Sequence, residues 1–119
     1  MTKERQHTGR TREQIACDFL KEQGYSIVER NHRSRLSEID IVTEHREYLV
    51  FCEVKTRRSR AGLHPSLSVT AKKIEKLRML GENYLSQKHL MHLQPRFNVI
   101  AVQLAGKTPP DIDYFVNAF

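Results

Sequence analysis

Three charged residues are spaced so that they could form one catalytic site. Glu53 and Lys55 lie two residues apart in an apolar run that begins at Tyr48, and Asp40 precedes Glu53 by thirteen residues. Alternate residues of a strand point to the same face, so Glu53 and Lys55 share a face if the run is a strand. Charges on an apolar strand are costly unless they are paired or bind a metal. Metal-assisted phosphodiester hydrolysis uses two acids and a lysine, so the spacing predicts a nuclease site.

A divalent cation would relieve the repulsion between two neighbouring carboxylates, which otherwise raise each other's pKa. Mg²⁺ binds one or two carboxylates together with water and phosphate oxygens, so we expect Asp40 and Glu53 to hold one or two Mg²⁺ or Mn²⁺ ions. The metal would activate a water, and Lys55 would orient it or stabilise charge developing on phosphorus. The alternative is a cross-strand salt-bridge ladder in which Glu53 and Lys55 pair with Asp40 and Arg57.

Asp40 and Glu53 can meet only if their strands form a hairpin. Residues 37–43 and 48–56 read as strands joined by a short turn, which predicts an antiparallel pair. This register places Asp40 opposite residues 51–53, close enough for a shared metal. Asp40 and Glu53 should then lie on a face that a helix covers in part. The opposite face is expected to carry the apolar side chains Ile39, Ile41, Val50, Cys52 and Val54.

The remaining pattern predicts two helices and three further strands around the hairpin. The helices are expected over residues 8–23 and, with Thr70 as N-cap, to about residue 86. The further strands are expected over residues 25–30, 97–104 and 112–116, and a basic loop over 31–36. The order α-β-β-β-α-β-β predicts a single α/β domain over residues 9–119, with a mixed sheet of about five strands. Residues 1–8 are expected to be a disordered N-terminus.

The composition of the 119 residues suits one cytoplasmic domain. No run of apolar residues is long enough for a membrane span, and the first residues lack the apolar core of a secretory signal. Cys17 and Cys52 are the only cysteines. A disulfide between them is possible in principle, but two buried reduced thiols are favoured in a cytoplasmic protein.

The formal net charge of +6 favours a polyanionic partner, and nucleic acid is the expected one. Generic solubility would explain the same charge, so charge alone does not decide. Most of the basic residues occur in four groups, namely Lys3 to Arg12, Arg30 to Arg35, Lys55 to Arg60, and Lys72 to Arg78.

Residues 37–42 (Ser-Glu-Ile-Asp-Ile-Val) and 51–57 (Phe-Cys-Glu-Val-Lys-Thr-Arg) together resemble the YraN-like family of small bacterial endonucleases. That family belongs to the PD-(D/E)xK restriction-endonuclease-like superfamily and is similar to Holliday-junction resolvases. The resemblance extends from about Gly9 to Phe119. Its weaker matches are Gly9-x-x-x-Glu13, Gly24-Tyr25, Arg30-Asn31, Val69-Thr70-x-x-Lys73, residues 95–100 and residues 117–119.

The resemblance implies a restriction-endonuclease-like α/β/α core and assigns catalytic and metal-binding roles to Asp40 and Glu53, with Lys55 as the catalytic lysine. It also implies that Glu13, on the first helix, completes the metal site, although from the residues alone it is an exposed helix carboxylate. Glu38 matches the family motif one pleat away from Asp40. For DNA contact, the expected phosphate-binding residues are Arg57, Arg58 and Lys73.

Three positions depart from the family pattern. Ser37 and Arg12 stand where the family usually has Gly, and Asn98 stands where it usually has Asp. Ser37 would be strained if its backbone needed a positive φ. Asn98 would weaken an auxiliary acidic site. None of the three removes a predicted catalytic residue.

We therefore expect a metal-dependent endonuclease acting on DNA, with branched or structured DNA among the candidate substrates. The main alternative is a non-catalytic nucleic-acid-binding module with the same fold, and a third is a protein-interaction subunit. The residues do not decide between DNA and RNA, nor whether the chain forms a homodimer.

Overall fold

The computed structural model describes residues 11–35, 37–57, 70–103 and 111–116. Within them the predicted order α-β-β-β-α-β-β is confirmed. The expected disordered residues 1–8 lie outside the described part of the chain. The elements are α2 (Arg12–Glu22), β1 (Ser26–Arg33), β2 (Glu38–His45), β3 (Tyr48–Arg57), α3 (Ala71–Gln87), β4 (Gln94–Gln103) and β5 (Asp111–Phe115).

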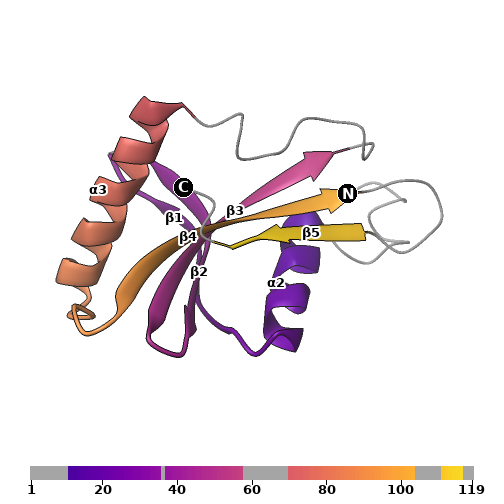
Figure 1. The fold of residues 1–119 in the computed structure, drawn as a ribbon, viewed down its shortest axis with the longest axis horizontal. Helices are drawn as coiled ribbons and strands as arrows, with labels where there is room; N and C mark the ends of the chain where they lie inside the picture. Colours follow the sequence, from indigo (N-terminus) through magenta and orange to yellow (C-terminus); the bar gives the residue numbers. More distant parts are fainter. Residues whose placement is uncertain (1–10, 36, 58–69, 104–110, 117–119) are drawn as a thin grey trace.

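The five strands form one mixed sheet in the order β1-β2-β3-β4-β5. β3 and β4 are parallel, and every other neighbouring pair is antiparallel. A parallel pair needs a long crossover connection, and α3 lies on the stretch of chain between β3 and β4 (Figure 1). The sequence-predicted mixed sheet is therefore confirmed.

The two helices cover opposite faces of the sheet and make an α/β/α sandwich (Figure 1). One core cluster joins α2 to residues such as Ile41, Val50 and Ile100, and the other joins α3 to residues such as Phe51 and Phe97. Because strand side chains alternate, residues of β3 supply both cores in turn. Cys17 and Cys52 are buried free thiols in the α2-side core, as predicted.

Threonine hydroxyls begin both helices. Thr11 Oγ1 accepts the Gln14 N–H at 3.1 Å, and Thr70 Oγ1 accepts the Lys73 N–H at 3.1 Å. Each hydroxyl satisfies a backbone N–H that has no partner within its helix, which confirms Thr70 as the predicted N-cap. No helix in the described ranges is long and apolar enough to cross a membrane.

The first helix was expected from residue 8 but begins at Arg12, because Thr11 is extended and caps it. The structure corrects two further details of the prediction. The expected basic loop over residues 31–36 is in part strand, because β1 continues to Arg33 and pairs with β2 through Arg33↔Glu38. Asn31 makes this continuation possible, since asparagine tolerates the positive φ of 54° found there. Ile39 was expected on the same face as Ile41, but it packs in the α3-side core while Ile41 packs in the α2-side core.

Candidate active site

The candidate active site lies at a fork in the sheet, where β2 and β3 stop pairing. Their ladder runs from His45↔Tyr48 to Ile41↔Cys52. Beyond it, β2 remains paired with β1 to Glu38, while β3 remains paired with β4 to Arg57. The residues that follow the last ladder pair are Asp40 on β2 and Glu53 on β3, and the charge of Glu53 acts on Asp40.

Asp40 itself helps to end the ladder. Its Oδ2 accepts the backbone N–H of Val54 at 2.7 Å, so a side chain holds the donor just past the last ladder pair. A carboxylate that accepts a short backbone hydrogen bond is fixed in position. Asp40 therefore ties β2 to β3 at the fork while remaining half-buried there.

Electrostatics at the fork act against ionisation of Asp40. Burial raises the pKa of its carboxyl group, and the carboxylates of Glu13, Glu53 and Glu38 raise it further, while the hydrogen bond from Val54 lowers it. The net pKa is above its ordinary value. A positively charged ligand at the fork would therefore stabilise the ionised form.

Glu53 is held by an ion pair from α3. Lys73 Nζ lies 2.8 Å from Glu53 Oε1, and the two side chains are 42% and 23% exposed respectively. The second carboxylate oxygen, Oε2, is buried and has no hydrogen-bond partner among the described residues. Buried polar atoms of this kind are rare, so this oxygen is a candidate metal ligand.

Glu13 is placed near the fork by the first turn of α2. Its charge is among those that raise the pKa of Asp40, so the helix brings it within electrostatic range of that acid. Arg12, at the same end of α2, donates from Nη1 to Thr56 Oγ1 at 3.2 Å and so connects the helix to β3. The arginine that departs from the family pattern thus contributes a contact that positions its neighbour.

The predicted basic residues take different positions. Lys55 is half-buried on the same face of β3 as Glu53, since the parallel ladder with β4 is regular across both residues. Lys73 was expected to contact phosphate, and in the structure its ammonium pairs with Glu53. Arg57 is the last residue of β3, and Arg58 lies outside the described residues.

The donor set at the fork fits a cation that takes few protein ligands. Asp40 has a raised pKa and Glu53 has an unsatisfied buried oxygen, and both features favour a bound positive charge. Three or more metal-ligating side chains are not clustered anywhere in the described ranges. Mg²⁺ and Mn²⁺ suit such a site, because Mg²⁺ keeps several waters and takes one or two carboxylates.

The other two departures from the family pattern have structural explanations. Ser37 is not among the described non-glycine residues with positive φ, so a serine there is not strained. Asn98 is buried on β4 next to Cys52 and donates to Tyr114 Oη at 2.6 Å. This amide lies on the opposite face of the sheet from Glu53, since Cys52 and Glu53 are consecutive on β3.

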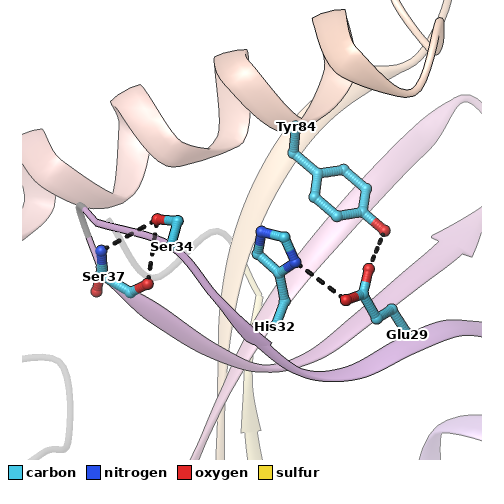
Figure 2. Close-up of polar contacts among 5 residues, drawn as sticks. All are labelled: Glu29, His32, Ser34, Ser37 and Tyr84. Atoms are coloured by element: carbon cyan, nitrogen blue, oxygen red, sulfur yellow. Dashed lines mark hydrogen bonds and ion pairs between the residues drawn. The ribbon is translucent and has the colours of Figure 1, made fainter.

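Sequence reasoning missed a polar chain on β1. Tyr84 Oη donates to Glu29 Oε1 at 2.8 Å, and Glu29 Oε2 lies 3.0 Å from His32 Nδ1 (Figure 2). Glu29 and His32 are three residues apart across the positive φ of Asn31, and Tyr84 comes from α3. The contacts of Glu29 with His32 and Tyr84 could not be predicted, because residues 31–36 were expected to form a loop. A loop gives no regular spacing from which side-chain partners can be inferred.

The chain is similar to a family of known proteins over the region that contains the fork. A model of the uncharacterised protein family UPF0102 matches residues 12–102, a range that holds Glu13, Asp40, Glu53, Lys55 and Lys73. A UPF0102 protein of Syntrophotalea carbinolica is 40% identical over 119 residues, which is 100% of this chain and 96% of that protein. Another, from Trichlorobacter lovleyi, is 44% identical over 115 residues, which is 96% of this chain and 91% of that protein. These matches confirm the resemblance noted from the sequence.

Proposed function

The chain belongs to the uncharacterised family UPF0102, and from that premise we propose that it is a metal-dependent endonuclease that hydrolyses phosphodiester bonds in DNA. The observation that carries the proposal is the state of the two acids at the fork. Asp40 is half-buried with a raised pKa, and Glu53 has a buried oxygen without a described partner. An acid pair in this state is stabilised by a cation, and carboxyl groups whose pKa is shifted by burial and neighbouring charge are found preferentially at functional sites.

We assign the roles as follows. Asp40 and Glu53 would hold Mg²⁺ or Mn²⁺, and Glu13 would act on Asp40 through its charge, since the three acids do not form one cluster of ligands in the described ranges. A bound divalent ion polarises a phosphate and lowers the pKa of a bound water. Lys55, on the face of Glu53, would orient the water or stabilise negative charge on the phosphate. Lys73, Arg57 and Arg58 would contact the neighbouring phosphates of the DNA.

A cleavage assay tests the proposal. The panel would contain linear duplex, single-stranded, flapped and four-way-junction DNA with Mg²⁺ or Mn²⁺, and an EDTA blank. We expect cleavage by wild type and a loss of at least about a hundredfold in Glu53→Gln and Lys55→Ala, the scale of a lost general-acid–base or electrostatic group. Glu47→Gln, an exposed carboxamide substitution in the hairpin turn, is the matched control. Metal-dependent cleavage that survives both site variants would contradict the assignment.

The second candidate is a non-catalytic nucleic-acid-binding module with this fold. The Glu53–Lys73 ion pair favours it, because an internal ammonium can neutralise Glu53 without any metal. A Mg²⁺ titration followed by thermal unfolding separates the two candidates. A metal site raises the melting temperature in wild type and not in Asp40→Asn, whereas a module without a metal site responds equally in both.

A further inference from the structure

A second polar site lies on the α3 side of the sheet, away from the fork. It is a pocket of about 340 Å³ between the end of β1 with the turn that follows it and the C-terminal half of α3. His32, Ser34 and Arg35 line it from the β1 side, and Asn83 and Gln87 line it from the helix. The volume is at the lower end of the range for small-molecule sites, so it suits one ligand of modest size.

The described part of the pocket floor is apolar. Leu80 and Tyr84 are buried beneath it, and Met79, which is 46% exposed, forms part of the wall. A methionine side chain adapts to flat and irregular apolar ligands. Among the described residues that line the pocket there is no carboxylate, and Arg35 adds an exposed positive charge. The pocket therefore favours a ligand with an apolar flat part and a negative charge.

The hydrogen-bonded chain Tyr84–Glu29–His32 behind the pocket sets the orientation of the His32 ring. Burial alone would raise the pKa of Glu29, but the hydrogen bonds from His32 and Tyr84 lower it overall, so Glu29 is ionised. An ionised carboxylate only accepts hydrogen bonds, so both Tyr84 Oη and His32 Nδ1 must donate to it. The other ring nitrogen of His32, Nε2, points away from Glu29 (Figure 2), and in the neutral imidazole it is the acceptor.

The turn that carries Arg35 is also held in place. The Ser34 N–H donates to Ser37 O at 3.0 Å. The Ser34 hydroxyl also donates to Ser37 O at 3.3 Å and accepts the Ser37 N–H at 3.3 Å (Figure 2). Arg35 lies between these two serines and is exposed at the edge of the pocket. A guanidinium on a fixed turn is suited to bind a phosphate with two parallel hydrogen bonds.

We propose that this pocket binds one nucleotide, with the base against Leu80 and Met79 and the phosphate at Arg35. Asn83 and Gln87 carry both donors and acceptors and would bind the edge of the base, while His32 Nε2 would accept from an exocyclic amino group. Recognition of this kind requires a base that is not paired, because its edge and face must both be accessible. The ligand is either a free nucleotide or an unpaired nucleotide within a strand.

The position of the pocket favours the strand. Lys73, which contacts Glu53 at the fork, precedes Met79 by six residues and Asn83 by ten on α3. At ~1.5 Å per residue the pocket lies ~9–15 Å along the helix from the fork. A stacked strand rises ~3.4 Å per nucleotide, so an unpaired nucleotide in the pocket would lie about three to four nucleotides from the fork. This reading rests on the proposed function and names its substrate class as DNA with an unpaired nucleotide near the cut.

The test uses the whole chain in EDTA, so that binding is measured without hydrolysis. Fluorescence anisotropy would compare a duplex containing one unpaired adenine with the same duplex fully paired. Wild type should bind the first about tenfold more tightly, equivalent to about 1.4 kcal/mol. Arg35→Ala and Asn83→Ala should each reduce this preference to about twofold or less. The controls Arg78→Ala and Ser86→Ala change exposed residues of α3 outside the pocket and should keep the preference.

A second arm identifies the source of the nucleotide. In ¹H–¹⁵N spectra, deoxyadenosine monophosphate should shift the side-chain amides of Asn83 and Gln87. Shifts without a preference for the unpaired adenine would assign a free nucleotide, and the preference without shifts would assign the strand. The proposal is overturned if neither is seen, or if the pocket variants leave both unchanged. Neither experiment needs a metal or Glu53, so the nucleotide-pocket proposal and the nuclease proposal are tested separately. If cleavage is observed but the pocket variants have no effect on binding, only the nucleotide-pocket proposal is wrong.

Discussion

The surroundings of Asp40 disfavour its ionised form, and this gives the folded protein a defined pH dependence. Burial and then the charges of Glu13, Glu53 and Glu38 hold the pKa of Asp40 above its ordinary value. The folded protein therefore keeps this proton to a higher pH than the unfolded chain does. As the pH rises from the ordinary aspartate pKa through the raised one, the folded state binds more protons than the unfolded state, so stability falls across that window.

Asp40→Asn should remove this loss. The amide oxygen can still accept the Val54 N–H, but no charge is buried beside the other acids. We expect the variant to be more stable than wild type at neutral pH by about 1 kcal/mol, the scale of one optimised charge. Urea unfolding at a series of pH values from about 4 to about 7 measures the difference and its slope. Glu47→Gln, in the exposed turn, is the control, and equal pH slopes in both variants would contradict the argument.

Lys73→Met tests whether the ammonium on α3 competes with a metal for Glu53. The change leaves a half-buried carboxylate without its partner at 2.8 Å. Because both side chains keep contact with water, the cost should be about 1 kcal/mol rather than the roughly 3–5 kcal/mol of a fully buried pair. Differential scanning fluorimetry should show a lower melting temperature in EDTA and a larger rise on adding Mg²⁺ than in wild type. Lys72→Met, one residue away and exposed, should show neither effect.

At the scale of elements, the fit of α3 on the sheet depends on a glycine. A Cβ atom at Gly81 would lie 3.0 Å from Phe97 Cζ and 3.2 Å from Phe51 Cε2. These two rings stack on each other with their centroids 5.3 Å apart, so neither moves without disturbing the other. Gly81 therefore sets how closely the helix that carries Lys73 approaches the strand that carries Glu53.

Gly81→Ala should destabilise the protein despite the better helix propensity of alanine. Alanine gains about 1 kcal/mol in an exposed helix interior, whereas forcing a methyl group into a packed core costs about 1–3 kcal/mol. We expect a net loss of about 1 kcal/mol, and a larger loss for Gly81→Val, whose β-branched side chain adds further contacts. Chemical denaturation with Ser86→Ala as the control measures it. A stability gain in Gly81→Ala would mean that the two rings can shift.

Hairpin periodicity was enough to predict the register that brings the β2–β3 ladder to within one residue of Asp40 and of Glu53, because side-chain alternation and turn length set the register. It could not place Ile39, since the Asp40 carboxylate takes the Val54 N–H and β2 leaves the regular ladder there. Nor could it extend β1 past Asn31, where a single positive φ lets the strand continue. Alternation describes regular strands, and both errors occur where a side chain or a backbone angle interrupts the regularity.

At the scale of the whole molecule, long-range side-chain partners were the part that sequence patterns left open. Lys73 was expected at phosphate, and the packing of α3 brings it to Glu53, twenty residues away along the chain. The contact between Tyr84 and Glu29 spans fifty-five residues, and only the α3 layer brings it about. The order of the elements, the layers and the strand register follow from local sequence patterns. The side-chain partners depend on the angle at which α3 crosses the sheet.

The charge of the whole chain predicts how DNA binding responds to salt. The net charge is +6, and α3 presents Lys72, Lys76 and Arg78 as exposed cations. If about five phosphates are neutralised, log K falls with log salt at a slope of about −4.5, a loss of roughly 500-fold between about 50 and about 200 mM KCl. Fluorescence anisotropy in EDTA with a duplex probe measures the slope, and Lys76→Ala should make it shallower by up to about one unit. The nuclease and the non-catalytic module both require this slope, because each must bind a polyanion. A slope near zero would contradict both DNA-binding hypotheses. The protein-interaction subunit would then be the hypothesis that remains.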